Sequence, residues 1–98
     1  MVDNAKIFWS DQALRNLEAI ILYLKTSWSE KEVDNFLKKL DHGIILIAQR
    51  PKMFPMSLLR LKLRRFVLTK QVSIIYAENK LGITIVSLFD NRQDPSTL

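Results

Sequence analysis

The 98-residue sequence contains no cysteine, one histidine and only two glycines. Without cysteine the chain has no disulfide, no thiolate zinc site and no cysteine nucleophile, which suits the reducing cytoplasm. A single histidine argues against a transition-metal site. Gly43 and Gly82 lie too far apart for a glycine loop that cradles phosphate. We therefore expect no metal and no cofactor.

Long apolar runs are missing as well. No stretch approaches the ~20 apolar residues that a bilayer-crossing helix needs, and residues 1–4 lack the basic-then-apolar layout of a secretion signal. We expect a cytoplasmic protein with no membrane contact. The hydrophobic content of 48% and the charged content of 26% are typical of a globular chain. The length predicts one domain over residues 1–98.

Acidic residues are absent from a long part of the chain. Residues 42–77 hold seven Lys or Arg and no Asp or Glu. The most densely basic part of the chain comprises Arg60, Lys62, Arg64, Arg65 and Lys70. A one-sided positive field favours encounter with polyanions or with acidic protein surfaces. The alternative is a solvated strand face that carries an excess of cations.

The apolar periodicity predicts a short strand followed by two helices. Residues 5–9 are aromatic and β-branched, which favours a strand. Ser10 is a predicted N-cap, and Ser29 with Glu32 forms a capping box before a second helix that ends at Pro51. The short linker predicts an antiparallel hairpin. The expected buried stripes comprise Leu14, Leu17, Ile21, Leu24 and Trp28 on the first helix and Val33, Phe36, Leu37, Leu40, Ile44 and Ile47 on the second.

Two residues of the second helix carry separate expectations. Gly43 costs roughly 1 kcal/mol against alanine inside a helix, which predicts a close crossing with a neighbouring element. His42 has no partner motif and is expected to be an ordinary surface or interface histidine.

After Pro55 the apolar period changes from 3.6 to 2. Residues 59–63 alternate leucine with cations, which predicts a half-buried strand. The phase shifts at Arg64 and Arg65, and this shift predicts either a bulge or a long strand that buries opposite faces at its two ends. Residues 72–77 and 83–89 are apolar at most positions and are predicted central strands. The order β-α-α-β-β-β predicts an α+β fold, with a helical hairpin packed on a small, mostly antiparallel sheet.

Short motifs follow one another in a specific order over nearly the whole chain. They are Trp9-Ser10…Ala13…Leu17, Arg50-Pro51, Arg64-Arg65, Ser73-Ile74-Ile75-Tyr76 and Phe89…Arg92-Gln93-Asp94-Pro95. Together they resemble the RelE/ParE family of toxins from bacterial type II toxin–antitoxin systems. The resemblance implies a small toxin that a co-expressed antitoxin holds inactive by wrapping across its surface.

That family divides by target: its RelE branch cuts mRNA in the ribosomal decoding site, and its ParE branch is associated with poisoning DNA gyrase. RNA cleavage needs a base for the 2′-OH, positive charge at the phosphate and an acid for the leaving oxygen. The nuclease branch supplies these from Lys and Arg on the sheet and from a Tyr or His near the C-terminus. Arg65 (or Arg64) and Arg92 match the two arginine positions. Lys62 and Lys70 are weak substitutes for a C-terminal Tyr or His, which this chain lacks.

No Tyr or His follows Arg92, so the acid–base set is incomplete and the resemblance favours the ParE-like branch, which acts by binding. The weak catalytic candidates are Lys62, Arg65 and Arg92. The implied partners are a cognate antitoxin, whose binding residues are not assigned, and DNA gyrase as the target. The expected target-binding residues are Arg60, Lys62, Arg64, Arg65 and Arg92.

Alternatives stay open for both the function and the residues. The chain is alternatively a ribosome-dependent mRNA endoribonuclease of the RelE branch, or a plain nucleic-acid-binding module that uses its basic strand. Structural salt bridges to Asp90, Asp94 or a helix acid are the alternative role for Arg64 and Arg65, and a local pair with its flanking Asp90 or Asp94 is the alternative role for Arg92. Trp9 and Trp28 are expected as core or hairpin anchors, whereas an exposed tryptophan would indicate the antitoxin interface.

Overall fold

Two helices separate a short first strand from a three-stranded antiparallel unit. A computed structural model describes residues 5–56 and 62–90. The elements are β1 (Ile7–Trp9), α1 (Asp11–Ser27), α2 (Glu30–Gln49), β2 (Arg64–Val67), β3 (Val72–Asn79) and β4 (Gly82–Asp90). The predicted order β-α-α-β-β-β is confirmed. None of the helices in the described ranges is long and apolar enough to span a membrane.

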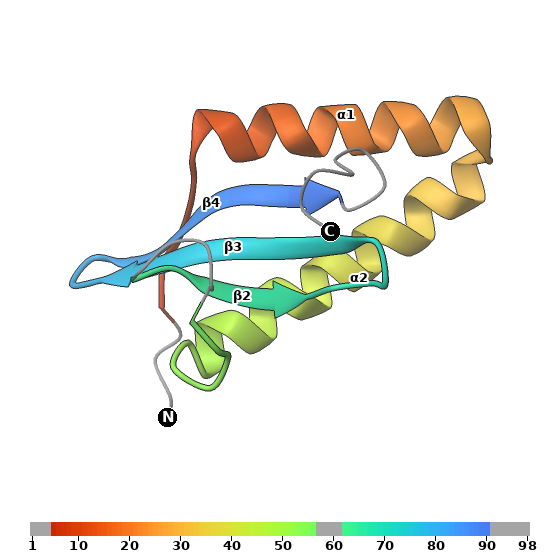
Figure 1. Ribbon diagram of the computed structural model, residues 1–98. Helices are drawn as coiled ribbons and strands as arrows, with labels where there is room; N and C mark the ends of the chain where they lie inside the picture. Colours follow the sequence, from red (N-terminus) through yellow and green to blue (C-terminus); the bar gives the residue numbers. More distant parts are fainter. Residues whose placement is uncertain (1–4, 57–61, 91–98) are drawn as a thin grey trace.

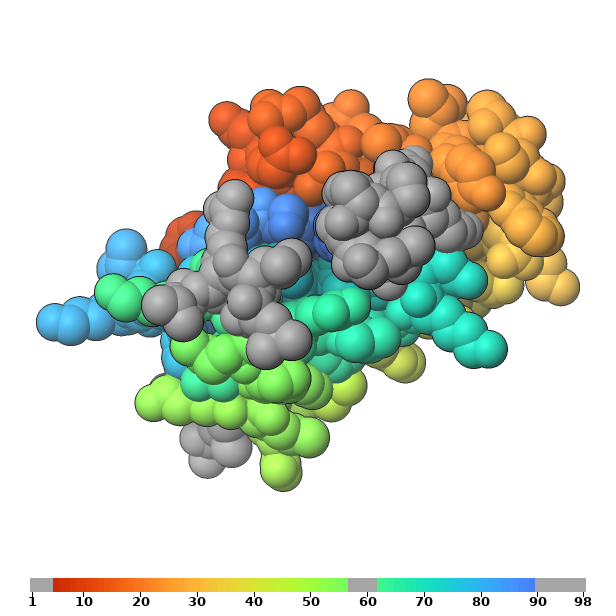
Figure 2. All heavy atoms as spheres, in the orientation of Figure 1, coloured from red at the N-terminus to blue at the C-terminus, as the bar shows by residue number. Residues whose placement is uncertain are grey.

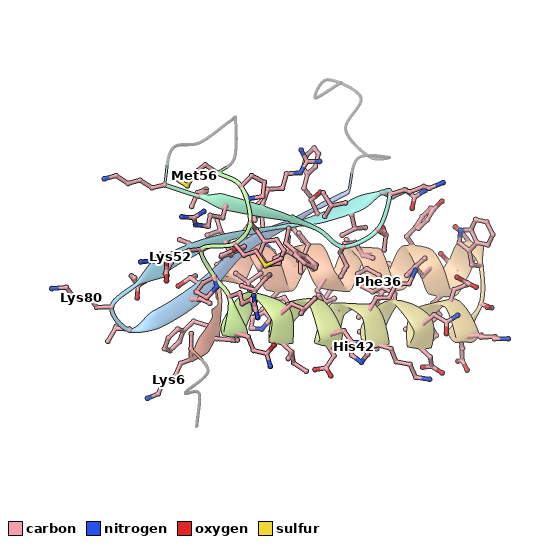
Figure 3. All side chains as sticks on the ribbon, turned by 90° about the horizontal axis from the view of Figure 1, so that it is seen from below. Lys6, Phe36, His42, Lys52, Met56 and Lys80 are labelled. Atoms are coloured by element: carbon pink, nitrogen blue, oxygen red, sulfur yellow. The ribbon has the colours of Figure 1, made fainter. Side chains whose placement is uncertain are left out.

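The sheet has the order β1-β4-β3-β2, so the first strand lies beside the last (Figure 1). β1 pairs with β4 in parallel, and the other two pairings are antiparallel, as predicted. Both helices form a second layer on one face of this sheet (Figure 3). The core between the layers contains Ile74 and Tyr76 from β3 and Ile83 and Ile85 from β4, all fully buried.

Both predicted helix caps are confirmed. The Ser29 hydroxyl accepts from the backbone N–H of Glu32 at 3.3 Å, and the Ser10 hydroxyl accepts from Ala13 N–H at 3.0 Å. The Ser10 hydroxyl also donates to the Val86 carbonyl at 2.7 Å, and the Leu88 N–H donates to the Asn16 side chain at 3.2 Å. The first turns of α1 therefore satisfy the part of the β4 edge that the short β1 does not reach.

These contacts also explain why the predicted apolar stripe of α1 is partly wrong. The buried residues are Ala13 and Ile20, whereas Leu14 is 43% and Trp28 65% exposed. Because Asn16 is directed at β4, the helix is rotated and the predicted stripe lies partly beside the core. The stripe of α2 is largely confirmed, although Leu37 is 38% exposed.

The predicted strand over residues 59–63 is wrong where the structure describes it. Lys62 lies in a turn with a φ of 72°, in the left-handed region, and the strand begins only at Arg64. The chain before this turn runs back along β2, because Arg65 N–H donates to the Pro55 carbonyl at 3.0 Å. No bulge is needed at the paired arginines. The observed irregularity lies instead between Ile75 and Tyr76 in the β3–β4 pairing.

Gly43 marks the close crossing that the sequence predicts. A Cβ atom there would lie 2.9 Å from Cε2 of Phe66 and 3.0 Å from Cδ1 of Leu68. The Phe66 ring also packs edge-on against Phe54, with centroids 4.7 Å apart. It therefore has little freedom to move away, and α2 can approach β2 this closely only with glycine at this position.

Substitution of Gly43 by valine should lower the free energy of unfolding by about 1–3 kcal/mol, because the branched side chain overpacks the contact with Phe66 and Leu68. Urea denaturation followed by circular dichroism measures this change. Asp41→Val, at an exposed position of the same helix, is the control and should shift stability by no more than about 0.5 kcal/mol. Equal effects of the two variants would contradict the close packing.

Candidate functional site

The two adjacent arginines of β2 point to opposite faces of the sheet. Arg64 is half-buried and Arg65 is exposed. The Arg64 guanidinium donates to the Phe54 carbonyl at 2.6 Å and to the Lys52 carbonyl at 3.3 Å. Its hydrogen bonds therefore go to backbone carbonyls, and its observed role is to attach the segment after α2 to the sheet.

Tyr76 attaches the same segment from the neighbouring strand. Its side chain is fully buried, and its hydroxyl donates to the Pro51 carbonyl at 2.6 Å. Burial raises the pKa of Tyr76 from 10.0 to about 12; the charge of Arg64 opposes this rise and that of Glu78 adds to it. The phenol therefore stays protonated at neutral pH, and its hydrogen bond to Pro51 holds the segment after α2 against the sheet.

Arg65 lies on the sheet face opposite the helices. Its Nε donates to the Ser73 hydroxyl at 3.1 Å, and Ser73 is only 1% exposed. Val67, two residues further along the same face, is 61% exposed. Among the described residues, none accepts a hydrogen bond from the two terminal nitrogens of Arg65. We call the exposed residues Arg65 and Val67 the open sheet face; it combines a guanidinium held by one hydrogen bond with exposed apolar surface.

The structure places the other candidate residues as follows. Lys62 is exposed in the turn before β2, three residues from Arg65 in the chain. Arg60 and Arg92 lie outside the described residues. His42 is exposed and lies on the side of α2 away from the sheet (Figure 3). The basic strand predicted as one surface is thus divided, with Arg65 on the open sheet face and Arg64 attached to a loop.

A groove that the sequence did not predict lies between the tip of the helical hairpin and the β2–β3 turn. These two segments lie at the same end of the molecule, coloured orange to yellow and teal (Figure 2). The groove has a volume of about 290 Å³, and we call it the hairpin groove. Its residues are Ile20, Leu24, Trp28, Glu32, Asn35, Phe36, Lys39, Thr69, Gln71 and Val72. The available sequence signal was Trp28, placed just before the capping box of α2.

The described part of the chain contains no cluster of three or more His, Asp or Glu side chains that is able to hold a metal ion.

Comparisons with known proteins identify what the chain is similar to. Residues 7–95 match the family described as the ParE toxin of the type II toxin–antitoxin system parDE. A solved structure described as the chromosomal ParDE toxin–antitoxin system from P. aeruginosa has a TM-score of 0.76 at 12% sequence identity. The match covers 88% of this chain and 95% of that chain, and it shows a common fold. No curated protein sequence matches.

The opposite orientations of the two arginines predict different costs when each is replaced by alanine. Arg64→Ala should lower the free energy of unfolding by about 1.5–3 kcal/mol, because a charge-assisted hydrogen bond to Phe54 is lost. Arg65→Ala should cost less than about 1 kcal/mol. Urea denaturation of both variants measures the difference. A larger loss of stability for Arg65→Ala than for Arg64→Ala would show that the segment after α2 does not depend on Arg64.

The raised pKa of Tyr76 predicts that the folded protein loses stability in alkaline solution. Its pKa is raised in the folded state, so its contribution is complete below pH 10 and is lost as the pH rises toward 12. Tyr76→Phe should be about 1 kcal/mol less stable than the wild type at pH 7, since the Pro51 carbonyl loses its donor. The difference between the two proteins should shrink from pH 10 to pH 12.

Denaturation series at several pH values provide the measurement. Tyr23→Phe serves as the control. Because it retains Tyr76, its free energy of unfolding should fall between pH 10 and pH 12 as that of the wild type does. A constant difference between the wild type and Tyr76→Phe across this range would show that the hydroxyl is not held neutral by the fold.

Proposed function

This chain belongs to the ParE toxin family of type II toxin–antitoxin systems, and we propose that it inhibits growth by poisoning DNA gyrase and is neutralised by a cognate antitoxin. The family match extends over residues 7–95 and so includes every described strand and helix. Membership of the family follows from this match, whereas the gyrase target and the cognate antitoxin are proposed.

The observation that carries this proposal is the position of Arg65. Its Nε donates to the Ser73 hydroxyl, so the guanidinium is held in place, and its two terminal nitrogens donate to no described residue. Such a fork is suited to a carboxylate or a phosphate of a partner. Exposed Val67 beside it adds apolar area. Arg65 with Lys62, and with Arg60 and Arg92 outside the described residues, forms the proposed target-binding set.

Arg64 has a different place in this proposal. The sequence grouped it with Arg65 as a contact residue, but its hydrogen bonds to Phe54 and Lys52 fix the loop that precedes β2. It would influence target binding by keeping that loop in position. In this proposal Arg64 is therefore a positioning residue and not a member of the target-binding set.

The sheet tyrosine and the histidine also favour binding over catalysis. The Tyr76 hydroxyl is bound to the Pro51 carbonyl on the core side of the sheet, and His42 lies on the outer side of α2 (Figure 3). Neither can exchange a proton with a molecule on the open sheet face. Among the candidate residues this leaves lysine and arginine, whose positive charge suits the binding of a phosphate or a carboxylate.

The test combines growth with two target assays. Expression of the chain alone should arrest bacterial growth, and co-expression of the protein encoded beside it should restore growth. With purified gyrase, the toxin should inhibit supercoiling, while translated mRNA remains intact. Arg65→Glu should reduce inhibition at least about tenfold, since it reverses a proposed contact charge, whereas Arg65→Ala, which loses the same hydrogen bond to Ser73, measures how much of any fall in melting temperature comes from that bond.

Lys38→Glu is the matched control, because it makes the same charge change at an exposed position of α2, in the helical layer that lies on the other face of the sheet from Arg65. It should inhibit like the wild type. Codon-phased cuts in translated mRNA with normal supercoiling would instead assign the chain to the RelE-type endoribonucleases. DNA or RNA binding without growth arrest would indicate the plain nucleic-acid-binding module.

A further inference from the structure

Three segments meet at the end of the molecule opposite the tip of the helical hairpin (Figure 1). They are the β3–β4 turn, the start of β1 and the residues around the end of α2. The Ile83 N–H donates to the Lys6 carbonyl at 2.8 Å, and the Ala5 N–H donates to the Ala48 carbonyl at 3.4 Å. The start of β1 therefore joins the other two segments into one end of the fold.

Large apolar side chains are exposed at this end. Leu81, in the β3–β4 turn, is 76% exposed, and Met53, after α2, is 66% exposed. Leu46, in the last turn of α2, is exposed as well. The Leu81 and Gly82 N–H groups both donate to the Asn79 side chain, at 2.8 and 3.2 Å, so the turn is fixed and holds Leu81 at its tip. Single exposed apolar residues are ordinary, whereas several at one end indicate a contact surface.

The same end carries an excess of positive charge. Residues 5–8, 44–56 and 77–82 together contain four Lys or Arg and one acidic residue, Glu78. The cations are Lys6, Arg50, Lys52 and Lys80, all exposed. Lys6, Lys52 and Lys80 lie on the same side of the view in Figure 3. Within residues 5–56 and 62–90, none of the four cations forms an ion pair. We call these four cations, with Leu46, Met53 and Leu81, the basic end.

The shape of the basic end indicates what kind of partner it contacts. The β3–β4 turn protrudes from the molecule (Figure 2), so a folded protein partner would need a hollow of matching shape. The interface of a bilayer takes up a protruding apolar side chain and needs no such hollow. Lysine and arginine placed behind an apolar tip extend to lipid phosphates while their stems stay in apolar surroundings.

Two other occupants fit the basic end less well. Each copy of the chain has a net charge of +5, and two basic ends repel one another, which disfavours a dimer through this end. Along a nucleic acid, exposed Leu46 and Met53 would face phosphates and gain nothing from burial. An anionic bilayer suits both parts of the surface, because its headgroups attract the cations and its interface takes up the apolar side chains.

We propose that the basic end binds the surface of an anionic bilayer, with Leu81 and Met53 entering the interface and the four cations at the level of the lipid phosphates. The sequence led us to expect no membrane contact, because it has no spanning segment. Binding at the surface needs no such segment, since a few apolar side chains and cations supply the affinity. Arg65 is not part of the basic end, so the bound chain keeps the open sheet face accessible.

The experiment uses the purified full-length chain and two kinds of vesicle, one of phosphatidylcholine alone and one of phosphatidylcholine mixed with phosphatidylglycerol. Co-sedimentation should show at least about tenfold tighter binding to the anionic vesicles, because each cation near the surface adds to the attraction. Added salt should weaken this binding by screening the charges. Absence of binding at low salt, or equal binding to both kinds of vesicle, overturns the proposal.

Matched variants locate the contact. Leu81→Ser should weaken binding to the anionic vesicles about tenfold, because the apolar side chain no longer enters the interface. Leu22→Ser, at an exposed position of α1 in the helical layer, should bind like the wild type. Lys80→Gln should weaken binding about fivefold, and Lys38→Gln, at an exposed position of α2, should change it by less than about twofold. Circular dichroism checks that each variant is folded.

Each remaining outcome decides against the proposal. Binding to anionic vesicles that is unaffected by both Leu81→Ser and Lys80→Gln would place the lipid contact elsewhere on the chain. Tighter binding to duplex DNA than to vesicles, with the same dependence on Leu81 and Lys80, would make a nucleic acid the occupant. A dimer in light scattering that Leu81→Ser dissociates would make a second copy the occupant. None of these measurements depends on growth arrest or on gyrase, so they test the basic end separately from the proposed function.

Discussion

The close approach of α2 to β2 at Gly43 is the contact on which the rest of the structure depends. It holds Phe66 against the helix, and Phe66 packs edge-on against Phe54, which fixes the segment after α2. The carbonyls of that segment then accept hydrogen bonds from Arg64 and Tyr76. With Arg64 held on this side, the strand alternation directs Arg65 to the opposite face. A packing constraint in the core thus determines which arginine is available to a partner.

The positions of the two helices in the sequence were predictable because their capping signals are local. The rotation of α1 about its axis was not predictable from such signals. Ser10 and Ser29 mark both helix starts within a few residues of sequence. The rotation of α1 depends instead on Asn16 and Leu88, which are 72 positions apart, so the apolar spacing alone placed Trp28 in the stripe. The strand expected before Arg64 failed because a left-handed turn at Lys62 interrupts the alternation, and nothing in a lysine predicts that conformation.

The candidate site was predictable to a similar degree. Charge density directed attention to β2, but it grouped Arg64 with Arg65 because sequence does not show what each side chain contacts. The hydrogen bonds to Phe54 and Ser73 make that distinction. Arg60 and Arg92 lie outside the described residues and stay predictions. An interface role for exposed tryptophan was anticipated, although the groove beside Trp28 required the spatial meeting of α1, α2 and the β2–β3 turn.

The sheet itself separates the two roles of the basic strand. Arg65 lies on the face opposite the helices, where its Nε donates to the Ser73 hydroxyl, so a partner can meet its guanidinium only from that side. Arg64 and Tyr76 lie on the other side and hold the segment after α2 through its backbone carbonyls. Changes on one side therefore report on contact with a partner and changes on the other report on stability, because the backbone of the sheet lies between them.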